Sequence, residues 1–199
     1  MQKSATTIIS STTILAGETT LLSSCTAIDL SRGTQLVLTA KGTFNAASTS
    51  GMNILLSSSI DDSSYDTIYW DTYDIQNVRQ LGYTSGDEGW EYGELVTAAA
   101  GGTSTILGYT ISSGAFATGD AAGDLYLGSI TGTFTSTQSL TGGSSGCSAI
   151  QNGSIAAHSV IVTLYPIAVV PLYIRAQMHN KDYGYSITGA SLTSIKQSI

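Results

Sequence analysis

The segment Leu172-Tyr173-Ile174-Arg175-Ala176-Gln177-Met178-His179 alternates between apolar and polar side chains without a break. Its even-numbered positions carry Leu, Ile, Ala and Met, and its odd-numbered positions carry Tyr, Arg, Gln and His. A period of two residues is typical of a β-strand with one buried face and one solvated face. Pro166 and Pro171 flank the apolar run just before this segment, so no long helix can pass through here. The segment therefore predicts a strand of an antiparallel sheet.

The same period recurs in both directions along the chain. Residues 35–44 alternate, and Leu36, Leu38, Ala40 and Phe44 are expected to face a core. Segments 52–59 and 65–75, with turn residues at 61–64 between them, predict a β-hairpin. Further strands are expected at 7–15, 21–30, 104–111, 124–130, 132–137, 159–165 and 185–195.

Composition supports an all-β protein. Only 11% of the residues are charged, and the chain contains 29 Ser, 27 Thr and 22 Gly. Thr favours strands, while Ser and Gly favour turns. We expect an antiparallel β-sandwich, jelly-roll-like, as a single domain over residues 1–199 with an N-terminal arm at 1–6. Residues 79–157 are rich in Gly, Ser and Thr and predict a long β insertion or extended arm within it.

Charge and cysteine content exclude some classes of function. The net charge is −7 and the seven Lys and Arg residues are scattered singly, so nucleic-acid binding is not expected. No apolar run approaches the roughly 18 residues of a membrane span, and no secretory signal is visible. Cys25 and Cys147 are expected to be unpaired, partly buried thiols, although sequence leaves a disulfide between them open.

Acidic residues concentrate in one region, where nine of the fourteen lie within residues 61–94. One interpretation is a calcium site that uses Asp61, Asp62 and Asp66, although the EF-hand spacing is absent. Another is a glycosidase-type pair of carboxylates. The interpretation we favour is a solvated turn followed by an acidic loop, so neither a metal nor another cofactor is expected.

Catalytic motifs are weak. Residues 142–146, Gly-Gly-Ser-Ser-Gly, fit the Gly-x-Ser-x-Gly pattern formally, but no helical pattern follows them. His158 and His179 are the only histidines and have no zinc-site spacing. We therefore expect a protein that is not an enzyme.

Aromatic residues accompany the acidic region. Tyr and Trp stack on sugars and also anchor protein interfaces, so this stretch predicts an interface or a carbohydrate surface. The alternative is that Trp70 packs in the core with the tyrosines at its rim. The candidate contact residues are Tyr65, Tyr69, Tyr73, Tyr83, Trp90 and Tyr92.

Several segments carry a resemblance to a known class of proteins. They are the hairpin segment 52–75 with Ser64-Tyr65-Asp66-Thr67, then 160–167, 173–182 and 187–192. Together they resemble small β-sandwich or jelly-roll virion accessory proteins of tailed bacteriophages, of the capsid-decoration type. The resemblance covers residues 30–75 and 160–195, and the Gly/Ser-rich middle does not fit it. It implies no catalytic residues.

The resemblance implies a function. We expect a capsid decoration or cement protein that binds the major capsid protein on the outside of a phage head, as a homo-oligomer within a virion assembled in the host cytoplasm. One alternative is a neck, tail or fibre-attachment subunit of the virion. Another is a carbohydrate-binding module that uses the aromatic stretch 65–92.

Overall fold

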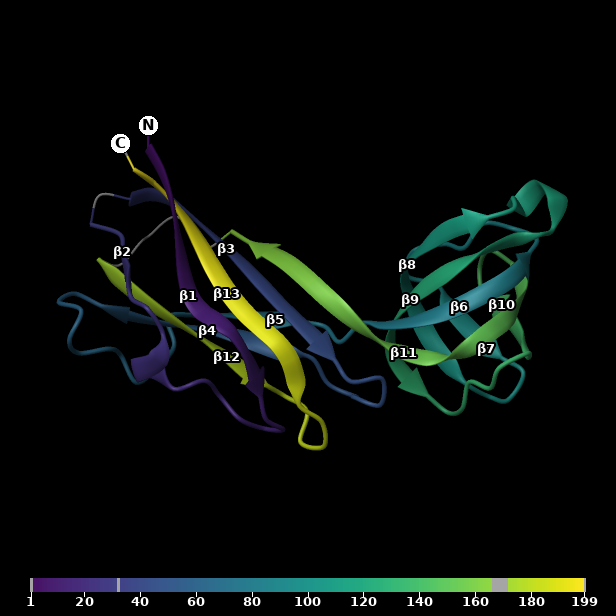
Figure 1. Cartoon of the computed structure of the whole chain (residues 1–199), viewed down its shortest axis with the longest axis horizontal. Coiled ribbons are helices and arrows are strands. Elements are labelled where there is room, and N and C mark those ends of the chain that lie inside the picture. Colours follow the sequence, from purple (N-terminus) through teal and green to yellow (C-terminus); the bar gives the residue numbers. More distant parts are fainter. Residues whose placement is uncertain (1, 32, 166–171, 199) are drawn as a thin grey trace. The chain divides into compact units, whose positions relative to one another are not determined.

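The structure is a computed structural model that describes residues 2–31, 33–165 and 172–198 (Figure 1). It is all-β, with antiparallel sheets packed against each other, and its helical turns are two short 3-10 segments, η1 (Leu22–Ser24) and η2 (Phe116–Thr118). The strands are β1 (Gln2–Ile14), β2 (Ile28–Asp29), β3 (Gly33–Phe44), β4 (Met52–Ser59), β5 (Asp71–Ile75), β6 (Arg79–Gly86), β7 (Leu95–Ala98), β8 (Thr103–Ser113), β9 (Ala121–Thr131), β10 (Ser139–Gly142), β11 (Ser148–Leu164), β12 (Tyr173–Asn180) and β13 (Ile187–Ser198).

The chain divides into two compact units, where the sequence predicted one domain with an insertion at 79–157. Unit 1 contains Met1–Phe44, Ser50–Gln76 and Ser159–Ile199, and unit 2 contains Asn45–Thr49 and Asn77–His158. Strand β11 begins in unit 2, and its last residues belong to unit 1. Among the described residues, no helix is long and apolar enough to cross a membrane.

Unit 1 is a sandwich with four strands in each layer. One layer is the end β1-β13-β3-β11 of a nine-stranded sheet, and the other is the four-stranded sheet β2-β12-β4-β5. The first sheet buries alternate residues of β3, as predicted: Leu36, Leu38, Ala40 and Phe44 are all at most 5% exposed. The second sheet contributes Ile54 and Leu56 of β4 and alternate residues of β12.

Strand β12, which contains most of the alternating segment 172–179, shows the predicted alternation of buried and exposed residues with two exceptions. Ile174, Ala176 and Met178 are fully buried. Gln177, predicted on the polar face, is also buried, because its side-chain amide donates a hydrogen bond to the Thr20 carbonyl oxygen at 2.5 Å. Leu172 precedes the strand and is exposed. Residues 166–171, which contain the apolar run and the two prolines that flank it, lie outside the described residues.

Four predicted segments differ from the structure. Residues 2–6, expected as an arm, continue β1 and pair with β13 from Ser194 to Ser198. Segment 21–30 contains only η1 and the two-residue β2. Segment 65–75 is a strand only from Asp71 onward, so the hairpin pairs β4 with β5 through a long loop. Segment 132–137 is a turn between strands.

Unit 2 is a six-stranded antiparallel sheet that closes on itself. Each strand pairs with two neighbours in the ring β6-β11-β10-β7-β8-β9, and β9 pairs again with β6. Closure removes the open edges that would otherwise template pairing with other chains. The enclosed core holds Leu81, Val96, Ile106, Leu125 and Leu127 among its fully buried side chains.

Candidate interaction site

The structure divides the predicted aromatic contact residues between the two units. Tyr65, Tyr69 and Tyr73 lie in unit 1, on or beside the connection between β4 and β5. The other three lie in unit 2, which contains Tyr83, Trp90 and Tyr92. The six residues are close in sequence, but neither unit contains all of them.

Tyr83 and Trp90 are corrections to the predicted contact set. Tyr83 is fully buried and Trp90 is 4% exposed, and their rings meet edge to face with centroids 5.8 Å apart. Phe116 stacks parallel to Tyr83 at 6.4 Å. Both residues thus belong to the core of unit 2 and offer no surface to a partner. Tyr92, by contrast, is 82% exposed.

The connection between β4 and β5, residues 60–70, is held by hydrogen bonds within itself and to β4. We call it the β4–β5 loop. At its start, the Asp61 carboxylate accepts hydrogen bonds from the Ser63 and Ser64 amides at 2.9 and 3.0 Å. Farther along, Asp66 accepts a bond from the Ser58 hydroxyl at 2.5 Å, and its amide donates to the Ser58 carbonyl oxygen. The bonds of Asp66 hold the loop against β4, and those of Asp61 fix its first turn.

Arg175 on β12 holds the middle of the loop. Its guanidinium lies 4.6 Å from the centre of the Tyr65 ring and 3.6 Å from the Asp62 carboxylate, and the Tyr65 hydroxyl donates to the same carboxylate. Burial, followed by the hydrogen bond to Asp62, raises the pKa of Tyr65 to about 12. The phenol therefore stays protonated and keeps donating at neutral pH.

The fixed loop carries apolar side chains in solvent. Ile60 and Ile68 are each 81% exposed, and Tyr69 is 42% exposed. Tyr69 was among the predicted contact residues, whereas the two isoleucines were missed. The alternation of 65–75 placed Ile68 in a strand, and Ile60 lies between the predicted strand 52–59 and the turn at 61–64. For Ile60 the available signal was an isolated isoleucine among Ser and Asp residues, where turn chemistry gives an apolar side chain no core to enter.

The three aspartates that a calcium site would need are engaged separately. Asp61 accepts from loop amides, Asp62 faces Tyr65 and Arg175, and Asp66 faces Ser58. Hydrogen bonds from Ser64 and Ser63 hold the pKa of Asp61 well below its usual range. Within residues 2–31, 33–165 and 172–198, no three His, Cys, Asp or Glu side chains gather to hold a metal ion.

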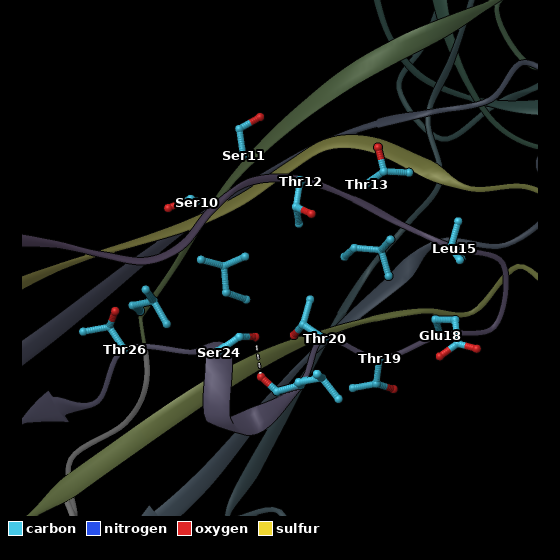
Figure 2. A pocket seen from close by; sticks show the side chains of 14 residues that line it. Ser10, Ser11, Thr12, Thr13, Leu15, Glu18, Thr19, Thr20, Ser24 and Thr26 are labelled. Carbon is cyan, nitrogen blue, oxygen red and sulfur yellow. Dashed lines mark hydrogen bonds between the residues drawn. The ribbon is translucent and has the colours of Figure 1, made fainter.

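A groove of about 540 Å³ lies elsewhere in unit 1, between β1 and the segment around η1. Figure 2 shows Thr12 and Thr20 pointing toward each other across it, whereas Ser11 and Thr13 point away. β1 is an edge strand, and its register with β13 shifts three times between Thr7 and Ile14. The groove is therefore lined by hydroxyl groups and aliphatic side chains at a sheet edge.

The Gly-Gly-Ser-Ser-Gly segment forms a structural turn around Glu94. This carboxylate accepts bonds from the Ser144 and Ser145 amides, the Ser145 hydroxyl and the Glu91 amide. The contacts of the two histidines lie elsewhere: His158 contacts Gln80 and Tyr126, and His179 contacts Thr19. The serines thus hold a buried carboxylate in place.

The two cysteines lie in different units. Both are unbridged, as predicted, but buried rather than partly buried. Burial raises the pKa of both thiols. Comparison of the chain with known protein families, with curated proteins and with solved structures gives no match. The function has to be argued from the geometry above.

Proposed function

We propose that this chain is a non-enzymatic structural subunit of a virion, a decoration or cement protein that binds the outer surface of a phage head. The observation that carries the proposal is the β4–β5 loop, which holds Ile60, Ile68 and Tyr69 in solvent on a hydrogen-bonded frame. Large apolar side chains fixed in solvent are typical of protein interfaces. The chain would assemble into virions in the host cytoplasm.

The strand order of unit 1 supports the proposal. Numbered in chain order, the eight strands of the sandwich run 1-8-3-6 in one sheet and 2-7-4-5 in the other. We propose that this is a jelly roll, an eight-stranded double sheet that occurs in viral capsid and lectin domains. Unit 2 then occupies the connection between the fifth and sixth strands. Fold alone does not decide function, so the loop remains the main argument.

The frame of the loop makes it suited to binding. A partner does not have to order a loop that Asp61, Asp66 and Arg175 already hold, so less conformational entropy is lost on association. Full burial of an isoleucine side chain contributes about 1.5–3 kcal/mol. Repetition over a shell, or homo-oligomerisation of the subunit, would multiply modest contacts through avidity.

A pair of matched variants tests the proposal. Ile68→Asp puts a charge at the centre of the loop surface, and Ile161→Asp makes the same change on β11, where Ile161 is 66% exposed. Both should fold, because neither side chain is buried. We expect wild type and Ile161→Asp to co-sediment with assembled phage heads, and Ile68→Asp to bind at least tenfold more weakly. Wild-type protein that stays in the supernatant would contradict the proposal.

The position in the particle has an alternative with its own test. A neck, tail or fibre-attachment subunit would use the same loop against a different partner. Such subunits would be present in tens of copies or fewer per particle, whereas a shell decoration follows the copy number of the capsid protein. Quantitative mass spectrometry of purified particles distinguishes the two locations.

A further inference from the structure

Unit 2 has a hollow of about 370 Å³ on the outside of its closed sheet, over strands β6, β9 and β11. Register irregularities surround it. Asn152 of β11 pairs with Gly82 of β6, but the next pair is Ala156 with Gln80, so β11 has extra residues between the two pairs. Near its start, β9 also has register shifts against both β6 and β8. Bulges of this kind re-aim side chains and occur often at binding sites.

The floor of the hollow is backbone. Gly82 and Gly123 both line it. A β-carbon on Gly82 would lie 2.6 Å from the Asn152 carbonyl oxygen, and one on Gly123 would lie 1.9 Å from the Thr110 carbonyl oxygen. Close approach of the neighbouring strands therefore excludes a side chain at these two positions.

The rim of the hollow combines one carboxylate with amides. Asp124 lies opposite Gly82 in the β6–β9 ladder, and Gln80 and Asn152 also line the hollow. Asp124 is half-buried, and its carboxylate accepts no hydrogen bond from any side chain or amide in the described part of the chain. Carboxylate and amide groups that converge with open hydrogen-bonding capacity suit a ligand rich in hydroxyl groups.

Two rings lie next to Gln80, beside the residues that line the hollow. Tyr126 is opposite Gln80 in the ladder, and its ring centre is 4.7 Å from that of His158, whose Nδ1 lies 3.4 Å from the Gln80 side-chain oxygen. Tyr126 is half-buried, so part of its ring faces solvent. An aromatic ring beside polar groups offers a stacking surface to the C–H face of a sugar.

We infer that this hollow in unit 2 is a binding site for a neutral sugar. Sugar hydroxyls would donate to Asp124 and bond with Asn152 and Gln80, while the apolar ring face would pack near Tyr126. Its volume is at the small end of ligand pockets, which fits a short glycan end. This inference goes beyond the proposed attachment role and uses none of the residues of the β4–β5 loop.

The test uses the full chain labelled with nitrogen-15, titrated separately with lactose, maltotriose and N,N′-diacetylchitobiose. We expect one of these sugars to shift the amide signals of Gly82, Gly123 and Asp124. Asp124→Asn should weaken that binding at least tenfold, because it removes a charged acceptor from the sugar hydroxyls. Glu91→Gln, the same kind of change at an exposed acid of unit 2, should leave it unchanged.

Asn152→Ala provides a second variant, and the amide spectrum of each variant reports directly whether it has folded. Binding that both folded variants retain, or shifts that lie away from the hollow, would overturn the inference. So would the absence of shifts with all three sugars, or binding restricted to sulfated or otherwise charged glycans tested in parallel.

Discussion

At the residue scale, Asn180 joins three segments of unit 1. Its side chain is fully buried, and its amide nitrogen donates to the carbonyl oxygens of Leu15 at 3.0 Å and Tyr185 at 2.8 Å. Its amide oxygen accepts a bond from the Asp182 amide at 3.0 Å. Replacement would leave these buried groups without partners, which is more costly than the bonds themselves are stabilising.

We therefore predict that Asn180→Ala lowers the free energy of unfolding of unit 1 by roughly 2–4 kcal/mol, from about 1 kcal/mol or more for each group left unpaired. Urea denaturation followed by circular dichroism measures the loss. Asn53→Ala, at a half-exposed position of β4, serves as a control with an expected effect several-fold smaller. Equal losses in the two variants would show that the amide network contributes nothing specific.

Glu94 gives a prediction with a pH dependence. Burial alone would raise the pKa of this carboxyl, but hydrogen bonds from Glu91, Ser145 and Ser144 outweigh burial and lower it. A carboxyl with a lowered pKa stabilises the folded state above its ordinary pKa near 4.5, and this contribution is lost as the pH falls through the lowered value. Glu94→Gln cannot accept from all of these donors.

We expect Glu94→Gln to reduce the stability of unit 2 by about 1–3 kcal/mol at pH 7. The difference from wild type should narrow below pH 4, where the wild-type carboxyl itself becomes protonated. Chemical denaturation at a series of pH values measures both effects. A difference that stays constant from pH 7 to pH 3 would contradict the assigned role of the carboxylate.

At the element scale, β1 shows where the sequence pattern was informative and where it was not. Its apolar residues at Ile8, Ile9 and Ile14 are buried, but the first six residues gave no pattern and were expected to form an arm. Residues 2–6 pair with β13 instead, because backbone hydrogen bonding places no requirement on side-chain alternation. Edge pairing of this kind is invisible to hydrophobic periodicity.

Deletion of residues 1–6 should therefore destabilise unit 1 rather than only remove a flexible arm. The deletion removes the ladder from Gln2 to Thr6, and each net backbone hydrogen bond contributes about 0.5–1.5 kcal/mol. We expect a loss of roughly 1–3 kcal/mol in unit 1, measured by thermal unfolding. An unchanged midpoint would mean that this end of β1 adds no stability.

Hydrophobic alternation predicted some segments correctly and failed for the β4–β5 loop. Segments 35–44 and 173–179 alternate in register with a core, so their buried faces could be predicted from sequence. Segment 65–75 also alternates, but Asp61, Asp62 and Asp66 bind loop amides and side chains and hold residues 60–70 as a loop. Local side-chain bonds to the backbone compete with strand pairing. Exposure of Ile60 and Ile68 follows from that competition and could not be predicted from periodicity.

At the scale of the whole molecule, the closed sheet of unit 2 could not be predicted from composition alone. Its Gly, Ser and Thr content predicted a β insertion or extended arm, yet residues such as Val96, Ile106 and Leu125 enclose a core of their own. Closure depends on pairings between strands far apart in sequence, such as β6 with β11, which no local pattern specifies. The two tryptophans allow each unit to be followed separately.

Trp70 lies in unit 1 and Trp90 in unit 2, so single-tryptophan variants report on one unit each. We expect Leu125→Ala, a fully buried position of unit 2, to cost about 2–5 kcal/mol in that unit. In a Trp70→Phe background the fluorescence midpoint should fall, whereas in a Trp90→Phe background it should stay close to that of the parent. Equal shifts in the two backgrounds would show that the units unfold together.

The central claim is that this subunit attaches to a phage head through the β4–β5 loop. The most direct measurement is a cryo-electron microscopy reconstruction of heads incubated with the protein, alongside heads incubated with Ile68→Asp. We expect regular copies over the icosahedral shell with residues 60–70 against the capsid surface, and little such density with the variant. Bare shells with wild-type protein, or density in which another surface makes the contact, would contradict it.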